Sequence, residues 1–243
     1  MQKDNQHWFT SWFDTPYYHI LYKDRDYNEA ATFMKKLTAF LKLEPNAEIL
    51  DLACGRGRHS KYLNEIGYNV LGADLSPSNI LFAKQFENKT LHFKVHDMCI
   101  PMNKTFDAVF NLFTSFGYFE SEEDNYRTIK AIKQQLKPHG YGVIDFLNTE
   151  YVKKTLIPEE KKVVEGITFN ITKKLQNGYI VKTIQFEDHG KHYTFQEKVK
   201  ALTLSDFKEY FKKASIDLKY ILGSYDLSNY NEDTSQRLIL IFK

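Results

Sequence analysis

Three carboxylates and two glycines within the first hundred residues could together bind a ligand that contains a nucleoside. Asp51 lies in an apolar run, and Gly55 and Gly57 follow it in "DLACGRG". Asp74 ends a second apolar run, "VLGAD", and Asp97 follows a third, "LHFKV". Glycines let a ligand approach the backbone, because a Cβ atom would otherwise occupy that space. A carboxylate at the end of the second strand can accept hydrogen bonds from both hydroxyls of a ribose.

Two classes of nucleoside ligand fit such a loop, and the charge of Asp51 separates them. A dinucleotide loop has the pattern G-x-G-x-x-G, but Ser60 stands here at the third glycine position. Asp51 would repel a pyrophosphate, whereas it suits the ammonium of S-adenosylmethionine, directly or through water. Asp97 could accept a hydrogen bond from the adenine amine, and Met98 offers a backbone N–H. The pattern favours S-adenosylmethionine over NAD, with helix capping or a plain turn as the alternative for each acid.

The surrounding pattern predicts the elements that position these residues. Apolar runs predict strands at 48–53, 68–74, 91–97, 106–113 and 141–147, and helical periodicity predicts helices at 28–43, 58–66, 77–88 and 121–137. Ser76 and Ser121 stand where they would cap the last two helices. This alternation predicts a doubly wound, mostly parallel sheet with helices on both faces. Ligands bind such sheets at the carboxyl ends of the strands.

The pattern changes after residue 150, where strand-like runs follow one another without helices. Three runs at 162–175, 179–188 and 191–202 are separated by Asn177–Gly178 and by His189–Gly190, which are good hairpin turns. They predict an antiparallel insertion of about three strands over about 160–202. A helix at 204–215, with Ser205 as its cap, and two strands at 217–225 and 236–243 would complete a seven-stranded sheet whose last pair is antiparallel. We expect one domain over 1–243, with 26–150 as the cofactor-binding core and 203–243 as its C-terminal helix and strands.

Four motifs resemble a known family when they are taken in order. "ILDLACGRG", "VLGADLS", "VHDM" and "FDAVFNLFTSFGYF" look like the successive motifs of class I S-adenosylmethionine-dependent methyltransferases, over about residues 45 to 150. The resemblance implies a Rossmann-like methyltransferase fold. It also implies cofactor contacts by Asp51, Ala53, Cys54, Gly55, Gly57, Asp74, Leu75, Asp97, Met98, Asn111 and Leu112. Among these, Asn111 and Leu112 would line the sulfonium and its methyl group.

Two further features bear on the subgroup within that family. The aromatic N-terminal segment and the insertion are similar to small-molecule N-methyltransferases of the glycine and amino-sugar type. Methyltransferases that act on nucleic-acid bases often carry "NPPY" or "DPPY" after the fourth strand, and this chain has "NLFTSFGY" instead. That difference speaks against an acceptor in nucleic acid.

Aromatic and basic residues supply candidates for contacts near the methyl group. Residues 1–25 are rich in aromatics and irregular in pattern, and they predict either a lid arm over the cofactor or core that covers the sheet edge. From this arm we expect cofactor contacts by Tyr17, Tyr22 and Arg25, acceptor contacts by Trp12 and Tyr18, and a general base in His19. From the exit of the fourth strand we expect acceptor contacts by Phe116 and Tyr118, with Tyr118 as a second candidate base. Packing is the alternative for the aromatics, and exposure to solvent is the alternative for Arg25.

Composition limits the remaining classes of function. The 243 residues carry a net charge of only +2, so no strong attraction to nucleic acid or membrane is expected. The sequence has no apolar run of 18 residues and no apolar signal segment, and its two cysteines form no disulfide framework, so we expect a cytoplasmic protein. His92, His96 and Cys99 lie close in sequence but lack a fourth ligand, so no metal site is expected.

The sequence therefore predicts methyl transfer from S-adenosylmethionine to a small-molecule amine or hydroxyl by in-line displacement. We expect the enzyme to be a monomer or a homodimer. Two alternatives stay open at this point: a methyltransferase acting on RNA or protein, and a cofactor-binding module without catalysis.

Overall fold

The computed structural model describes residues 12–23 and 27–243, apart from the side chains at 27 and 29. The described residues form two compact units. The smaller unit comprises 12–23 with 153–201, and the larger comprises 27–152 with 202–243. That the whole chain acts as one domain stays a prediction.

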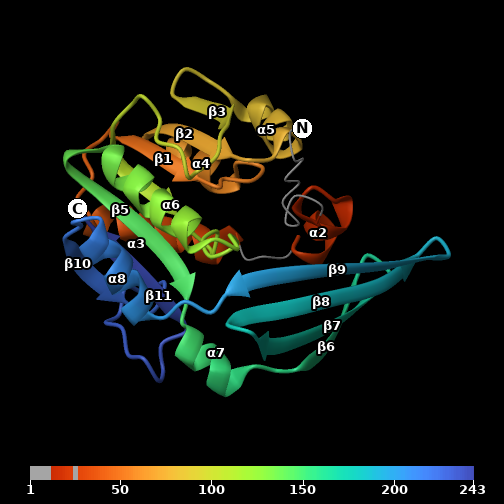
Figure 1. Ribbon diagram of the computed structural model, residues 1–243. Coiled ribbons are helices and arrows are strands. Elements are labelled where there is room, and N and C mark those ends of the chain that lie inside the picture. Colours follow the sequence, from red (N-terminus) through yellow and green to blue (C-terminus); the bar gives the residue numbers. More distant parts are fainter. Residues whose placement is uncertain (1–11, 24–26) are drawn as a thin grey trace, which may run out of the picture. The chain divides into compact units, whose positions relative to one another are not determined.

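A seven-stranded sheet is the centre of the larger unit (Figure 1). Its strands are β1 (Glu48–Leu52), β2 (Asn69–Asp74), β3 (Leu91–Val95), β4 (Phe106–Asn111), β5 (Leu136–Leu147), β10 (Leu218–Leu222) and β11 (Arg237–Phe242). Their order is β10-β11-β5-β4-β1-β2-β3, and only β11 runs antiparallel to its neighbours. This confirms the predicted doubly wound, mostly parallel sheet with an antiparallel last pair.

Helices and a short 3-10 turn connect these strands. They are α3 (Tyr27–Phe40), α4 (Arg58–Glu65), α5 (Pro77–Ala83), η1 (Lys84–Phe86), α6 (Glu122–Gln134), α7 (Thr149–Thr155) and α8 (Leu204–Lys213). Ser76 and Ser121 cap α5 and α6 as predicted, because each hydroxyl accepts a backbone N–H of the first turn. The predicted cap of α8, Ser205, is wrong. Thr203 caps this helix in a capping box with Asp206, and α7 was not predicted.

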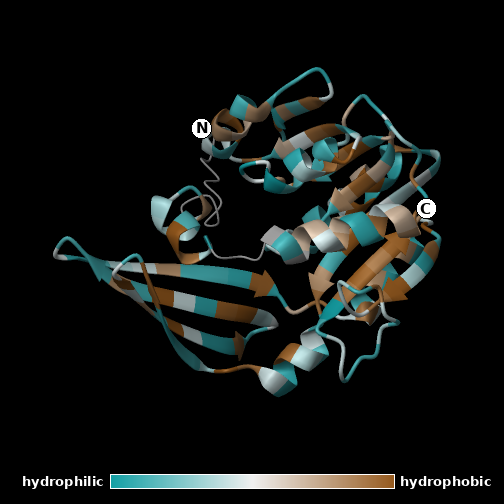
Figure 2. Cartoon of the chain, turned by 180° about the vertical axis from the view of Figure 1, so that it is seen from behind, coloured by the Kyte–Doolittle hydropathy of each residue, from teal (hydrophilic) through white to brown (hydrophobic). Residues whose placement is uncertain are grey.

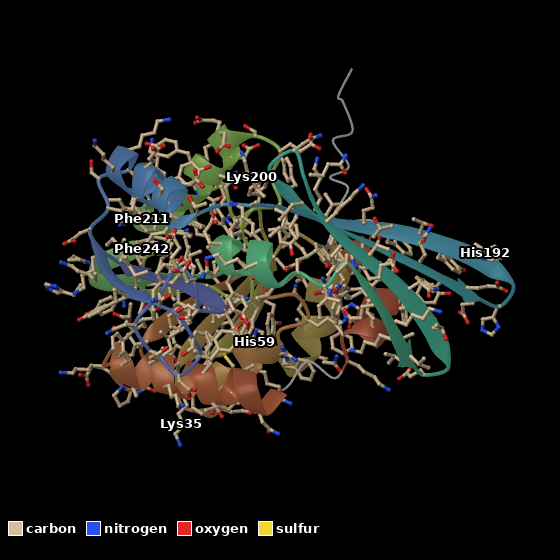
Figure 3. All side chains as sticks on the ribbon, turned by 90° about the horizontal axis from the view of Figure 1, so that it is seen from below. Lys35, His59, His192, Lys200, Phe211 and Phe242 are labelled. Carbon is tan, nitrogen blue, oxygen red and sulfur yellow. The ribbon has the colours of Figure 1, made fainter. Side chains whose placement is uncertain are left out.

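Apolar side chains fill both sides of the large sheet, whose strands are mainly brown in Figure 2. Phe110 in β4 and Val143 in β5 have no exposed surface, as expected for strands that are buried on both faces. At the antiparallel side, the rings of Phe211 and Phe242 pack with their centroids 4.8 Å apart (both labelled in Figure 3). These contacts fix the sheet whose strand ends position the site.

The smaller unit contains a four-stranded antiparallel sheet, one strand more than predicted. Its strands are β6 (Glu159–Val164), β7 (Ile167–Gln176), β8 (Tyr179–Asp188) and β9 (Lys191–Lys200). The predicted first run is broken at Glu165–Gly166, where both φ angles are positive, 51° and 80°. The predicted turns at Asn177–Gly178 and His189–Gly190 are confirmed and also have two positive φ angles. Such turns match the twist of the strands that they join.

Residues 16–21 form a helix, α2 (Pro16–Leu21), although an irregular segment was predicted. The hydroxyl of Thr15 caps this helix, and proline stands at its first position. Trp12 and Leu21 are about 1% exposed and pack with Phe169 and Ile184 of the small sheet. The described part of the arm is therefore part of a packed core. None of the described helices is long and apolar enough to cross a membrane.

Candidate cofactor site

Strand register brings the predicted cofactor residues to one edge of the large sheet. In the parallel pairs of β1, Leu52 is opposite Ala73 of β2, and Asp51 is opposite Phe110 of β4. The carboxyl ends of these three strands therefore lie side by side, and Asp74 and Asn111 end β2 and β4 at this edge. This is the edge at which open α/β sheets bind ligands.

The loop after β1 turns sharply through residues with positive φ. Ala53, Gly55 and Gly57 have φ angles of 61°, 55° and 78°. A Cβ added to Gly55 would meet no described atom within 4 Å, so its backbone is open to a ligand. A Cβ on Gly57 would come within 2.6 Å of the Phe93 ring. Gly57 is therefore needed for packing of the helix against the sheet, and its predicted cofactor contact stays a prediction.

Asp74, at the end of the neighbouring strand β2, forms hydrogen bonds with the glycine loop and with the residue that caps α5. One carboxylate oxygen accepts the Gly55 N–H at 2.8 Å, and the other accepts the Ser76 N–H at 2.9 Å. Ser76, and not Asp74, caps α5, so helix capping is excluded as the role of Asp74. Asp74 is partly exposed beside the open backbone of Gly55, and its contact with ribose hydroxyls stays a prediction.

Asp51 is a buried acid beneath the same loop. Its side chain accepts a hydrogen bond from the Ser60 hydroxyl at 2.6 Å, and the residue is 3% exposed. Burial raises the pKa of Asp51 to about 7, and the neighbouring charge of Asp74 acts in the same direction. Ser60 thus replaces the third glycine with a donor to Asp51. A cation such as an ammonium would favour the ionised form.

Asn111 carries an unsatisfied acceptor at this edge. Its amide nitrogen donates to the Leu52 carbonyl at 3.2 Å and lies 3.7 Å from the Met98 sulfur. Its Oδ1 is buried and has no hydrogen-bond partner among the described residues. A buried acceptor without a partner is costly, so a donor from a ligand would satisfy it. The amino group of S-adenosylmethionine is such a donor.

The other predicted cofactor residues lie around this edge. Asp97 follows β3, and its carboxylate accepts the Cys99 N–H at 2.9 Å. Leu112 is 4% exposed directly after β4, and Cys54 packs into the core of the large unit. Leu75 follows Asp74 and is partly exposed. The open space at Gly55, the carboxylate of Asp74 and the orphan oxygen of Asn111 fit S-adenosylmethionine. The individual contacts stay predictions.

A buried ion pair behind the site was not predicted. Asp145 of β5 has no exposed surface, and it accepts hydrogen bonds from Arg237 Nε at 2.8 Å and from the Phe113 N–H at 2.7 Å. Burial raises the pKa of Asp145, while the Arg237 guanidinium opposes that shift. The sequence signal was an acid inside the apolar run "GVIDFL" and an arginine at the start of "RLILIF".

An aromatic cluster links the glycine loop to the exit of β4. The ring of Phe113 stacks on His59 of α4, with centroids 4.3 Å apart and planes 21° apart (His59 is labelled in Figure 3). Phe33 and Tyr225 pack on the same ring with centroid distances of 6.1 and 5.5 Å. Arg58 donates to His59 Nε2 at 2.9 Å.

Phe116 is buried at the exit of β4. It has no exposed surface and packs against Phe207 of α8, with ring centroids 5.4 Å apart. This burial favours the packing alternative, and the acceptor contact of Phe116 stays a prediction. Tyr118 is partly exposed in the same loop, and its roles toward acceptor and proton stay predictions.

The candidate residues of the N-terminal segment belong to the smaller unit. The indole of Trp12 and the hydroxyl of Tyr22 both donate to Glu197, at 2.8 and 2.6 Å. The hydroxyl of Tyr17 donates to Asp188 at 2.9 Å, and Tyr18 packs edge-on against Trp12 and His19. These contacts attach α2 to the small sheet. The predicted roles of these residues toward cofactor and acceptor stay predictions, and Arg25 lies outside the described residues.

The three residues that were considered as metal ligands contact different groups. His96 Nε2 lies 2.6 Å from the Ile100 carbonyl, and the Cys99 sulfur lies 3.2 Å from the Thr128 hydroxyl. His92 is exposed. Within 12–23 and 27–243, no three histidine, cysteine or acidic residues gather in a way that could hold a metal ion.

Comparison with known proteins identifies the class. Residues 50–144 match the family model described as a methyltransferase domain. This part of the chain thus matches a methyltransferase domain, which confirms the resemblance of its four motifs.

Three relatives show how far the similarity extends. A putative methyltransferase of Bacillus subtilis is 36% identical over 42% of this chain and 43% of its own length. A glycine/sarcosine N-methyltransferase of Aphanothece halophytica is 31% identical over 53% of this chain and 49% of its own. A dTDP-amino-sugar N,N-dimethyltransferase of Streptomyces venezuelae is 24% identical over 83% of this chain and 88% of its own. The chain thus spans less than half of the first two relatives and most of the third.

Two solved structures share the fold. A S-adenosylmethionine-dependent methyltransferase from Clostridium acetobutylicum superposes with a TM-score of 0.78 at 19% identity, covering 93% of this chain and 95% of that one. A sugar N-methyltransferase from a Streptoalloteichus species superposes with a TM-score of 0.74 at 20% identity, covering 92% of both chains. The likeness therefore includes the small antiparallel sheet as well as the large one.

Proposed function

We propose that this protein transfers the methyl group of S-adenosylmethionine to a small-molecule acceptor, with an amine as the favoured acceptor. The observation that carries this proposal is the edge formed by Gly55, Asp74 and Asn111. It combines open backbone at Gly55, the partly exposed carboxylate of Asp74, and a buried amide oxygen of Asn111 without a partner among the described residues. A ligand that contains a ribose and an ammonium group would be complementary to all three features.

The residues of this edge would bind and orient the donor rather than supply reactive groups. Asp74 would accept from the ribose, Asp97 and Met98 would contact the adenine, and Asp51 and Asn111 would face the ammonium. S-adenosylmethionine brings a methyl group that its sulfonium charge already activates. Alignment of the two reactants can then supply about 7–11 kcal/mol of the barrier, which makes rigid placement of the strand ends the main contribution of the protein.

An amine acceptor makes the fewest demands on the chain. Its nitrogen lone pair forms the new bond to the methyl carbon while the bond from carbon to sulfur breaks, and the nitrogen then loses a proton to solvent. A hydroxyl acceptor would need a general base, for which Tyr118 and His19 are the candidates. The relatives named as glycine and amino-sugar N-methyltransferases support an amine. The net charge of +2 offers little attraction for a polyanionic acceptor.

A panel assay tests the proposal. The full chain is incubated with S-adenosylmethionine labelled in its methyl group and with glycine, sarcosine, amino sugars, phenols and tRNA in parallel. We expect label in an amine and one equivalent of S-adenosylhomocysteine for each methyl transferred. Binding of S-adenosylhomocysteine without transfer to any member would favour the cofactor-binding module. Transfer to tRNA alone would favour the RNA alternative.

A further inference from the structure

The turn after β4 has a strained backbone that must be held by its surroundings. Phe113 and Thr114 are consecutive residues with φ angles of 57° and 60°, a region that residues other than glycine rarely adopt. Leu112, which directly precedes them, is expected to lie beside the reacting methyl group. Strain that persists at a ligand-binding edge points to a conformation needed for function.

Asp145 and Arg237 hold this turn from beneath. The carboxylate of Asp145 accepts the Phe113 N–H at 2.7 Å, and its main-chain carbonyl accepts the Thr114 N–H at 3.0 Å. Arg237 Nη2 bonds to Asp145 at 2.7 Å and also donates to the Thr114 hydroxyl at 2.9 Å. Both strained residues are thus bonded to one buried ion pair.

The ion pair is not explained by stability alone. Taking two charges out of water is costly, and apolar residues of similar volume often stabilise a fold as well or better. Here the Asp145 side chain has no exposed surface and that of Arg237 is 18% exposed. What an apolar pair could not supply is the acceptor for the Phe113 N–H and the donor to Thr114.

The held turn also reaches the glycine loop through the Phe113 ring. That ring stacks on His59, the second residue of α4, whose N-cap is Gly57 of the glycine loop. The ion pair therefore acts on the end of β4, and the Phe113 ring joins that end to the start of α4, whereas the backbone of Gly55 is held separately by Asp74.

From these contacts we infer that Asp145 and Arg237 are positioning residues for methyl transfer. They keep the turn at Phe113 and Thr114 in its strained form and so set the place of Leu112 against the glycine loop. The inference rests on the proposed function, because it concerns the placement of the reacting groups. It assigns no contact of either residue with cofactor or acceptor.

Arg237→Met is the main test, with Arg237→Lys as the conservative variant. We expect kcat for the best amine of the panel to fall about 100-fold in Arg237→Met, the loss that a misplacement of about 1 Å can cause. The dissociation constant of S-adenosylhomocysteine, measured by calorimetry, should stay near that of the wild type, because Asp74 and Gly55 are unchanged. Hydrogen exchange at the amides of residues 113 and 114 should quicken. Arg237→Lys keeps the positive charge but loses the planar guanidinium that bonds to two groups at once. Its kcat and its rate of hydrogen exchange should both be intermediate.

A second substitution distinguishes positioning from stability. Asparagine tolerates positive φ far better than threonine, so Thr114→Asn in the Arg237→Met background should recover most of kcat. Lys137→Met provides the matched control, because Lys137 of β5 pairs with Asp107 of β4 at 2.8 Å, at the opposite edge of the sheet. It should lower the melting temperature without changing kcat.

Three results would overturn the inference. They are an unchanged kcat in folded Arg237→Met, a parallel loss of kcat and S-adenosylhomocysteine affinity, and no recovery with Thr114→Asn. If Arg237→Met does not fold, Thr114→Val serves instead, since it keeps the buried pair and the bonds of the turn to Asp145 and removes only the bond from Arg237 to the Thr114 hydroxyl. It should then lower kcat without lowering affinity, and an unchanged kcat would again overturn the inference. A wild-type chain that binds no S-adenosylhomocysteine would refute the proposed function itself, which separates the two failures.

Discussion

Replacing Asp74 with alanine should weaken binding of S-adenosylhomocysteine by roughly 100-fold. Two hydrogen bonds from ribose hydroxyls to a carboxylate would be lost, and each bond to a charged group contributes about 1.5–3 kcal/mol. The lower bound of about 3 kcal/mol corresponds to about two powers of ten in the dissociation constant. The variant also loses the acceptor for the Gly55 N–H, which the structure places 2.8 Å from the carboxylate. The loop that faces the ligand would therefore be less ordered, which adds to the loss.

Calorimetric titration with S-adenosylhomocysteine measures this effect, and two further variants make it specific. Asp74→Asn keeps the size of the side chain and one acceptor oxygen, so its loss should be smaller. Asp107→Ala is the matched control, because Asp107 also accepts a backbone N–H, from Glu48 at 2.8 Å, at the other edge of the sheet. It should leave affinity unchanged. A folded Asp74→Ala variant with wild-type affinity would remove Asp74 from the site and refute the reasoning from the strand ends.

Four other outcomes are expected. NAD and NADP should give no thermal shift, since Asp51 repels a pyrophosphate and Ser60 replaces the third glycine; a shift equal to that with S-adenosylmethionine would contradict the choice of cofactor. Burial raises the pKa of Asp51 to about 7, so the folded chain keeps a proton that the unfolded chain loses above about pH 4. The contribution of Asp51 to stability should therefore fall as pH rises from about 4 to about 7. The free energy of unfolding of Asp51→Asn, from urea titrations, should lack this pH dependence. The same pH profile in the wild type and the variant would count against the raised pKa. Trp12→Ala should destabilise the smaller unit by about 3–5 kcal/mol, as for other buried tryptophans, seen as faster proteolysis within 153–201; unchanged cleavage would show that α2 is not part of its core. Activity should depend weakly on salt, because a small acceptor releases few counterions; a steep loss between low and moderate salt, with binding to tRNA, would favour the RNA alternative.

The large sheet and its glycine loop could be predicted from the sequence because their signals are local. Runs such as "EILDL" and "FDAVF" lie wholly within one strand each, and two of the helices, α5 and α6, begin at serine caps. Once the strands are parallel and adjacent, their carboxyl ends must meet at one edge. Asp51, Asp74 and Asn111 could therefore be brought together without any coordinates.

The local conformation of short segments was less well predicted. The sequence predicted one continuous strand across Glu165–Gly166 and missed the turn there. Glutamate is not a residue that indicates a turn with two positive φ angles. The helix at Pro16–Leu21 is too short for a periodic pattern to show. Its aromatics predicted either a lid or core that covers the sheet edge, and the described part of the arm packs against the small sheet.

The sequence by itself determined the class of sheet, the edge at which a ligand is expected to bind, and the chemistry of the residues at that edge. Each of these follows from residue types and from spacings within one or two elements. Only the tertiary structure decided which buried groups support that edge. Asp145 and Arg237 are 92 positions apart, and they meet because β11 lies antiparallel to β5 with Ile239 opposite Asp145. Arg237 lies two residues before Ile239 on β11, so its side chain is on the same face of the sheet as that of Asp145. This register depends on packing of the whole sheet, so no local pattern contains it.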